Sequence, residues 1–145
     1  LSPWMDNSVV ELLEKLGYSI LKPGFNYGVT ILNNVIREIA LRTRSVCGFN
    51  EVMLPYAEDN ELKKLGEKGV LKAHHLLLYS ATCVAGPDMI IVPESIDKLA
   101  GFLLDVYSVW LVKKKPLSTR VIPVNGVVGD RLDLGRFGYV TIIDY

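Results

Sequence analysis

Hydrophobic residues make up 50% of the 145-residue chain, and its 16 lysines and arginines equal its 16 aspartates and glutamates in number. This length suits a single domain, residues 1–145, or a fragment of one, with enough chain to bury a core. The equal charges exclude a strong overall positive field that would attract nucleic acid. The mean hydropathy is +0.27, but no uninterrupted apolar run approaches the roughly 20 residues of a membrane span. We therefore expect no membrane segment.

The two cysteines bear on metal binding and on the compartment. Cys47 and Cys83 are isolated, and neither stands in the spacing of a metal-ligand motif. We predict no metal site and two buried free thiols in a reducing compartment, with a disulfide as the alternative. No signal peptide is visible. The predicted location is intracellular, either cytoplasmic or mitochondrial.

The first half of the chain predicts two helices and two strands. Residues 6–16 fit a short helix that Asp6 or Asn7 caps and Gly17 ends. A short strand is predicted over 18–21, followed by a turn. A long helix is predicted over 27–46, because apolar residues recur there at the three- and four-residue steps of one helix face. Gly48 suits the end of that helix, and the strand 49–55 would end at Pro55.

The second half predicts helices over 60–71 and 95–111 and strands over 76–84, 89–92, 119–128 and 138–143. Ser95 is a suitable N-cap for the last helix, and Lys113–Lys115 follow at the negative end of its dipole. We expect the strands to pair as two hairpins. This order predicts an α+β fold in which an antiparallel sheet is flanked by helices.

The segment from the long helix to Pro55 resembles motif 1 of class II aminoacyl-tRNA synthetases, in particular the prolyl, threonyl and seryl group. The matching features follow in order: Gly28, the helix, Gly48-Phe49, Glu51-Val52 and Pro55. In that family a long helix and a proline-terminated strand build the dimer interface. The resemblance therefore implies a homo- or heterodimer. Its interface residues would be Leu32, Val35, Ile36, Ile39, Phe49, Val52 and Pro55.

The same resemblance implies a damaged motif 2. The family places an arginine and an acid on one strand and a second such pair on the next. The second pair matches Arg136 and Asp144, but the first falls on Val128 and Asp130. A valine cannot neutralise the charge that develops on the α-phosphate of ATP. Arg131 could replace the lost arginine only through a shift of three residues, which would turn its side chain to the opposite face of the strand.

Motif 3, which carries a second ATP-binding arginine, has no counterpart in these residues, so the implied fold is class II synthetase-like and truncated before motif 3. We predict a non-catalytic synthetase-like protein without a cofactor. It would serve as a dimerisation or accessory subunit in a translation or other RNA- or DNA-containing assembly. Two alternatives stay open. One is a fragment of an active synthetase that uses ATP and magnesium, and the other is an unrelated small α+β binding protein.

For each of the other candidate sites, a structural role explains the residues as well as a functional one does. The adjacent His74 and His75 point to different sides of a helix or strand, which disfavours a shared metal or acid–base site. Asp88 lacks the acid-any-lysine triplet that a metal-dependent nuclease would need. Asp130 and Asp133 suit a solvated hairpin tip. The triple lysine Lys113–Lys115 suits either contact with phosphate or a helix C-terminus.

Overall fold

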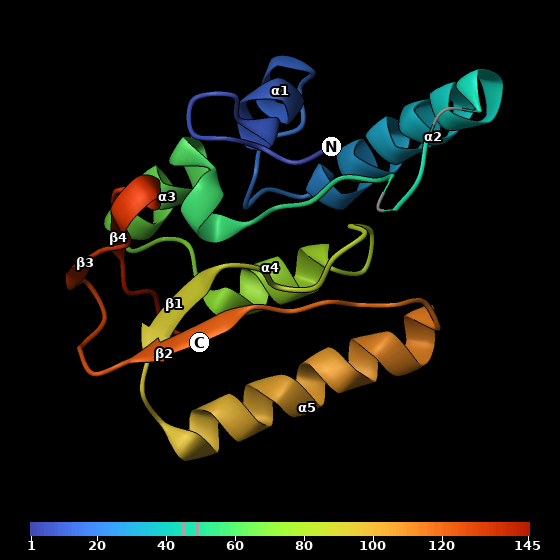
Figure 1. Ribbon diagram of the computed structural model, residues 1–145. Coiled ribbons are helices and arrows are strands. Elements are labelled where there is room, and N and C mark those ends of the chain that lie inside the picture. Colours follow the sequence, from blue (N-terminus) through green and yellow to red (C-terminus); the bar gives the residue numbers. More distant parts are fainter. Residues whose placement is uncertain (45, 49) are drawn as a thin grey trace.

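The computed structural model describes residues 1–44, 46–48 and 50–145. The described residues form an α+β fold, which confirms the predicted class (Figure 1). The α-helices are α1 (Val9–Lys15), α2 (Phe25–Thr43), α3 (Asn60–Glu67), α4 (Ala73–Tyr79) and α5 (Ile96–Lys113). The strands are β1 (Ile90–Pro93), β2 (Val121–Val124), β3 (Arg131–Asp133) and β4 (Tyr139–Thr141), and two short 3₁₀ turns are η1 (Tyr56–Glu58) and η2 (Gly135–Phe137). None of the helices in these ranges is long and apolar enough to cross a membrane.

A parallel βαβ unit forms the lower part of the molecule in Figure 1. β1 pairs with β2 in parallel, with Ile90 opposite Val121, and α5 makes the crossover between the two strands. Parallel strands require such a crossover because a short turn cannot reverse the chain twice. On its other side β1 receives the C-terminal segment, since Ile143 N donates to Ile91 O at 3.0 Å. β1 is therefore the buried centre of this unit.

The prediction of two antiparallel hairpins, 76–84 with 89–92 and 119–128 with 138–143, is wrong. Residues 119–128 supply β2, which pairs with β1 and not with residues 138–143. The antiparallel pair consists of β3 and β4. Residues 76–84 contain no strand, because residues up to Tyr79 belong to helix α4. Residues 18–21 also form no strand, and in the segment 50–55 only Pro55 makes an isolated bridge, to Asp88.

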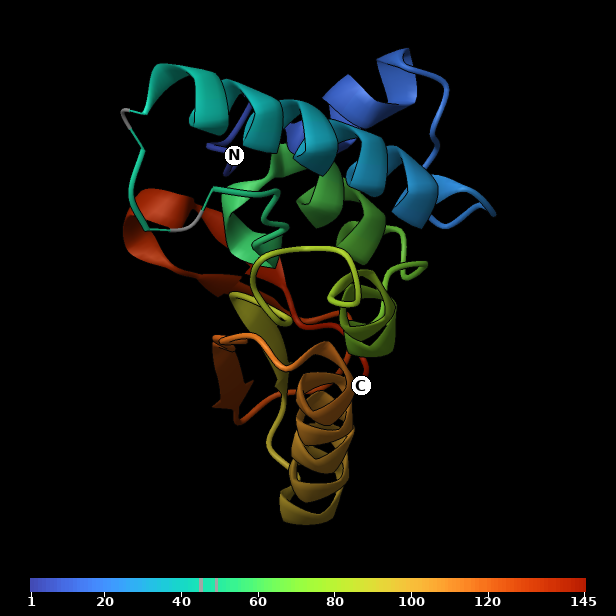
Figure 2. The same ribbon diagram turned by 90° about the vertical axis from the view of Figure 1, so that its right-hand side faces the viewer.

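Figure 2 shows α1 and α2 on one side of the molecule and α5 on the other, with α3, α4 and β1 between them. One core fills this space, and its largest fully buried side chains include Leu13, Phe25, Val29, Val52, Tyr56, Leu62, Ile90, Ile91 and Ile143. Tyr56 reaches across the core and donates from its hydroxyl to Thr141 O at 2.8 Å. Its ring passes so close to Gly66 that a Cβ there would collide with it. α3 therefore needs a glycine at this position.

A single buried carboxylate caps two helices. Asp59 Oδ1 accepts a hydrogen bond from Glu61 N at 2.9 Å at the start of α3. Its Oδ2 accepts one from Val9 N at 3.1 Å at the start of α1, where Ser8 is the N-cap residue. Both contacts place negative charge at the positive end of a helix dipole. The predicted caps of the first helix, Asp6 and Asn7, lie before Ser8 and are not its N-cap.

Replacing this carboxylate tests its double role. Asp59→Ala removes the side-chain cap from α3 and the second acceptor at α1, so we expect the free energy of unfolding to fall by about 2–4 kcal/mol. Urea denaturation followed by circular dichroism measures this change. Asp105→Ala, at an exposed position on α5, is the matched control and should change stability by less than about 0.5 kcal/mol. Equal losses in the two variants would contradict the double cap.

Candidate functional site

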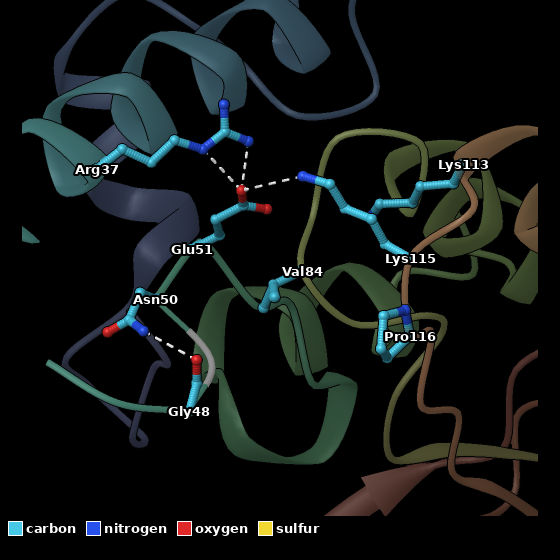
Figure 3. A pocket seen from close by; sticks show the side chains of 8 residues that line it. All are labelled: Arg37, Gly48, Asn50, Glu51, Val84, Lys113, Lys115 and Pro116. Carbon is cyan, nitrogen blue, oxygen red and sulfur yellow. Dashed lines mark hydrogen bonds and ion pairs between the residues drawn. The ribbon is translucent and has the colours of Figure 1, made fainter.

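A groove lined by several charged side chains lies between α2 and the C-terminal end of α5 (Figure 3). This groove has a volume of about 330 Å³. A second hollow of about 210 Å³ adjoins it and shares the side chains of Arg37, Glu51, Lys113 and Lys115. The groove is lined by Arg37, Gly48, Asn50, Glu51, Val84, Lys113, Lys115 and Pro116.

A buried asparagine fixes two walls of the groove. Asn33 is 2% exposed, and its Oδ1 accepts a hydrogen bond from Val52 N at 2.7 Å. Its Nδ2 donates to Thr82 O at 2.8 Å. The first bond holds the segment that carries Glu51 against α2, and the second holds the segment after α4. An unpaired amide at this depth would cost about 1–3 kcal/mol, so both segments are tied firmly to α2.

Glu51 is the centre of the charges in the groove. Its Oε1 accepts hydrogen bonds from Nε of Arg37 at 2.8 Å and from Nη2 of the same guanidinium. Nζ of Lys115 lies 4.0 Å from the same oxygen atom. Figure 3 shows both cationic side chains pointing at this carboxylate from opposite sides. The Glu51 side chain is only 12% exposed, whereas those of Arg37 and Lys115 are more than half exposed.

Lys113 adds a third cation, which also caps a helix. Its Nζ donates to Ser80 O at 3.0 Å and to Cys83 O, and Ser80 is the C-cap of α4. Burial lowers the pKa of Lys113, and the neighbouring Lys115 and Arg37 lower it further, while Glu51 acts in the opposite direction.

Three cationic side chains and one carboxylate therefore line the same groove, and two of the cations, Arg37 and Lys115, lie at that carboxylate. Among the described residues that line the groove and the adjoining hollow, Glu51 is the only acidic one. The surplus is positive, and a small anion would reduce the mutual repulsion of the cations. In the described part of the chain, no three histidines, cysteines or acids come together as a possible metal site. The groove is thus suited to holding an anion by charge and hydrogen bonds.

The residues of the predicted interface do not share one surface. Val35 and Ile39 on α2 are exposed, whereas Leu32 and Ile36 are partly buried against the core. The remaining described members, Val52 and Pro55, are buried. Phe49 lies outside the described residues.

The four residues assigned to a vestigial motif 2 are not gathered in one place either. Val128 and Asp144 line a pocket of about 290 Å³ beside α3. Asp130 is instead used within its own turn, where Oδ2 accepts a hydrogen bond from Val127 N at 3.0 Å. The guanidinium of Arg136 lies over the Phe137 ring at 4.8 Å and the Trp4 ring at 5.7 Å. These contacts have structural roles.

The histidines also have structural roles. Nδ1 of His75 accepts a hydrogen bond from Lys72 N at 3.0 Å at the start of α4. Burial lowers the pKa of His75, which favours the neutral ring that can accept this bond. His74 Nδ1 lies 3.2 Å from Tyr145 O.

The cysteines differ from each other in exposure. Both are free, but Cys47 is exposed, so the prediction of two buried thiols is wrong for it. Cys83 is buried as predicted. Burial raises the pKa of the Cys83 thiol to about 12, with Lys113 acting in the opposite direction, so it stays protonated at neutral pH.

Sequence reasoning found only part of the groove. It singled out the triple lysine, and Lys113 and Lys115 do lie in the groove. The sequence predicted no role for Arg37, and it placed Glu51 only within the motif 1 resemblance. These two residues are 14 positions apart and meet only in the folded chain, so periodicity carries no signal of their pairing.

The fold defines a small α+β protein whose polar groove lies beside a βαβ unit. The family model described as "Uncharacterised ACR (DUF711)" matches residues 1–135, and the chain belongs to this family. A UPF0210 protein of Bifidobacterium adolescentis is 30% identical over 98% of this chain and 33% of its own length. A UPF0210 protein of Sulfurisphaera tokodaii is 30% identical over 92% of this chain and 31% of its own length. The chain thus spans about a third of the length of these relatives.

This membership corrects the synthetase resemblance. The family match covers residues 1–135, which include the whole of the supposed motif 1 and the start of motif 2, and no aminoacyl-tRNA synthetase family matches the chain. The predictions of a synthetase-like pseudoenzyme, of an accessory subunit and of a role in translation are therefore wrong. The alternative of a small α+β protein unrelated to synthetases fits better.

The ion pairs of Asp144 predict a pH-dependent contribution to stability. Hydrogen bonds from Lys72 at 3.0 Å and Lys98 at 3.2 Å lower the pKa of Asp144 below its ordinary value of 3.8. A lowered carboxyl pKa stabilises the fold above pH 3.8, and this contribution is lost as the pH falls through the folded-state pKa. Because the side chain is 33% exposed, Asp144→Asn should cost only about 0.5–1 kcal/mol at pH 7.

Urea denaturation at pH 7 and at pH 2–3 measures this dependence. The gap between Asp144→Asn and the unaltered chain should close at the acidic pH. Asp105→Asn on the exposed part of α5 is the matched control and should show no such convergence. A constant gap across the pH range would contradict the assignment.

Proposed function

We propose that this region binds a small anionic ligand, a phosphate or carboxylate compound, in the groove between α2 and the end of α5. The observation that carries the proposal is that Arg37 and Lys115 lie at a single carboxylate, Glu51, in a groove that Lys113 also lines. The proposal develops the alternative of a small α+β binding protein. The proposal concerns only these 145 residues, which correspond to about a third of the length of the relatives.

The chemistry of the three cations supports an anionic ligand. A guanidinium presents five N–H donors, and the bonds of Arg37 to Glu51 use Nε and Nη2. The ammonium of Lys115 is a flexible point charge that can follow a ligand. Lys113 lies deeper and is held by two backbone carbonyls. Arg37 and Lys115 would therefore contact the ligand directly, while Lys113 contributes charge from below.

Glu51 would set the affinity by competing with the ligand. All three of its contacts with Arg37 and Lys115 involve Oε1. The carboxylate therefore already neutralises part of the positive charge of these two side chains. An anion must share the same cations. The affinity is therefore expected to be modest and to fall with salt, because partly exposed charges are screened.

The role in this proposal is binding alone, without a covalent step in this region. The expectation that the chain is not an enzyme, the predicted dimer and the intracellular compartment stay predictions. A phosphate or a carboxylate would suit the groove equally, since both bind arginine through two oxygens.

Two substitutions with opposite expected effects on the binding affinity test the proposal. Lys115→Met keeps most of the unbranched side chain but removes its charge, and we expect about 5–10-fold weaker binding of pyrophosphate or citrate. Glu51→Gln removes the competing carboxylate and should strengthen binding. Isothermal titration calorimetry at low and at high salt measures both effects. Lys68→Met, at an exposed position after α3, is the matched control and should bind as the unaltered chain does.

Either of two results would overturn the anion site. One is no heat of binding with pyrophosphate and with citrate at low salt. The other is an equal loss of affinity in Lys115→Met and Lys68→Met, which would indicate a general charge effect.

A further inference from the structure

α5 carries an apolar surface that the described fold does not cover. Of its residues, all of which the structure describes, only Phe102 and Val106 are buried. The side chains of Ile96, Leu104 and Val112 are 84%, 65% and 87% exposed. We define the outer face of α5 as Ile96, Leu103, Leu104, Tyr107, Leu111 and Val112.

Such a helix is unusual at the surface of a complete domain. A helix that is apolar on most sides is typical of the interior of a larger protein. Single exposed apolar side chains are common, but a continuous patch marks an interaction site. The charged residues of α5 are Asp97 and Lys98 in its first turn, Asp105 in the middle and Lys113 at the end. Between Asp105 and Lys113 the helix carries no charge.

The surface beside the outer face is shaped to receive side chains. The Tyr107 and Trp110 rings are stacked, with their centroids 5.5 Å apart. A hollow of about 490 Å³ is lined by Trp110, Leu111 and Pro116 among others. A second hollow, of about 380 Å³, is lined by Ala81, Val109 and Val112 among others. Each is larger than one large apolar side chain needs.

Addition of a strand to the neighbouring sheet is disfavoured. Arg120 O and Val124 O accept hydrogen bonds from β1, from Ile90 N and Glu94 N. Because backbone groups alternate along a strand, position 123 faces the open edge of β2. That position is Pro123, which has no N–H to donate. Whatever covers this side of the molecule therefore packs against α5 rather than extending the sheet.

We propose that the outer face of α5 packs against the part of the longer UPF0210 chain that lies outside the aligned third. The relatives carry about twice as much further polypeptide as the region that aligns with this chain. A family that retains this region within a chain three times its length has polypeptide available to bury it. Covering the leucines of the face would remove their apolar surface from water, which favours the packed arrangement.

Thiol labelling of α5 tests this packing. The probe is Leu104→Cys in a Cys47→Ser background, which removes the exposed native thiol. The labelling rate is compared between the 145-residue chain and a chimera. In the chimera, this chain replaces the aligned third of the Bifidobacterium adolescentis UPF0210 protein. We expect at least tenfold slower labelling in the chimera. Glu14→Cys, at an exposed position on α1, provides the matched control for reagent access.

A second measurement keeps the proposal testable if the chimera does not fold. The tagged 145-residue chain is co-expressed with the remaining two thirds of the same relative as a separate polypeptide, and the captured complex is quantified. Capture should occur with the unaltered chain and be lost with Leu104→Glu plus Leu111→Glu, but not with Asp105→Lys.

Two outcomes would overturn the proposal. One is equally fast labelling of Leu104→Cys in both chains, together with no capture of the remainder. The other is slow labelling of Leu104→Cys already in the isolated 145-residue chain, together with a solution mass twice 16.2 kDa. That result would assign the outer face of α5 to contact with a second copy of the chain.

Discussion

The groove depends on the buried amide of Asn33, because this side chain joins α2 to two irregular segments at once. Its bonds to Val52 N and Thr82 O, at 2.7 and 2.8 Å, fix the positions of Glu51 and of the carbonyls that hold Lys113. Asn26, two turns earlier on the same helix, adds bonds to Leu78 O at 3.3 Å and from Thr82 Oγ1 at 2.7 Å. α2 therefore presents an amide face as well as an apolar one, and the charges of the groove are placed by neutral hydrogen bonds.

Local signals were enough to predict the helices that carry their own caps. The predicted helix 95–111 corresponds to α5 (Ile96–Lys113), and Ser95 is its N-cap, as expected. The long helix 27–46 corresponds to α2 (Phe25–Thr43), although a left-handed Arg44, and not Gly48, ends it. For the first helix the extent was nearly right but the cap was not. Its second acceptor, Asp59, lies 50 residues away, and no local pattern can reveal such a partner.

The errors came from patterns that two structures satisfy equally. The run Leu76–Leu78 fits a buried strand or a buried helix, since a short apolar run does not fix the period. Capping by His75 at one end, and the bond from Ser80 Oγ to Leu76 O at the other, belong to a helix. The synthetase resemblance rested on a helix, a glycine and a proline-terminated strand in the right order. The described part of 49–55 is not a strand, so what remains is an order of elements that unrelated folds share.

The groove and α5 are parts of one mechanical unit, because Lys113 belongs to both. It is the last residue of α5, and its ammonium is bonded to carbonyls at the end of α4. Covering the outer face of α5 would hold this end of the helix still and would exclude water beside Lys113 and Lys115. Charge interactions strengthen as water is removed, so an anion would bind more tightly once α5 is covered. The present burial of Lys113 already lowers its pKa, and a bound anion would act in the opposite direction by favouring the charged ammonium. Packing at α5 and anion binding in the groove would therefore favour each other.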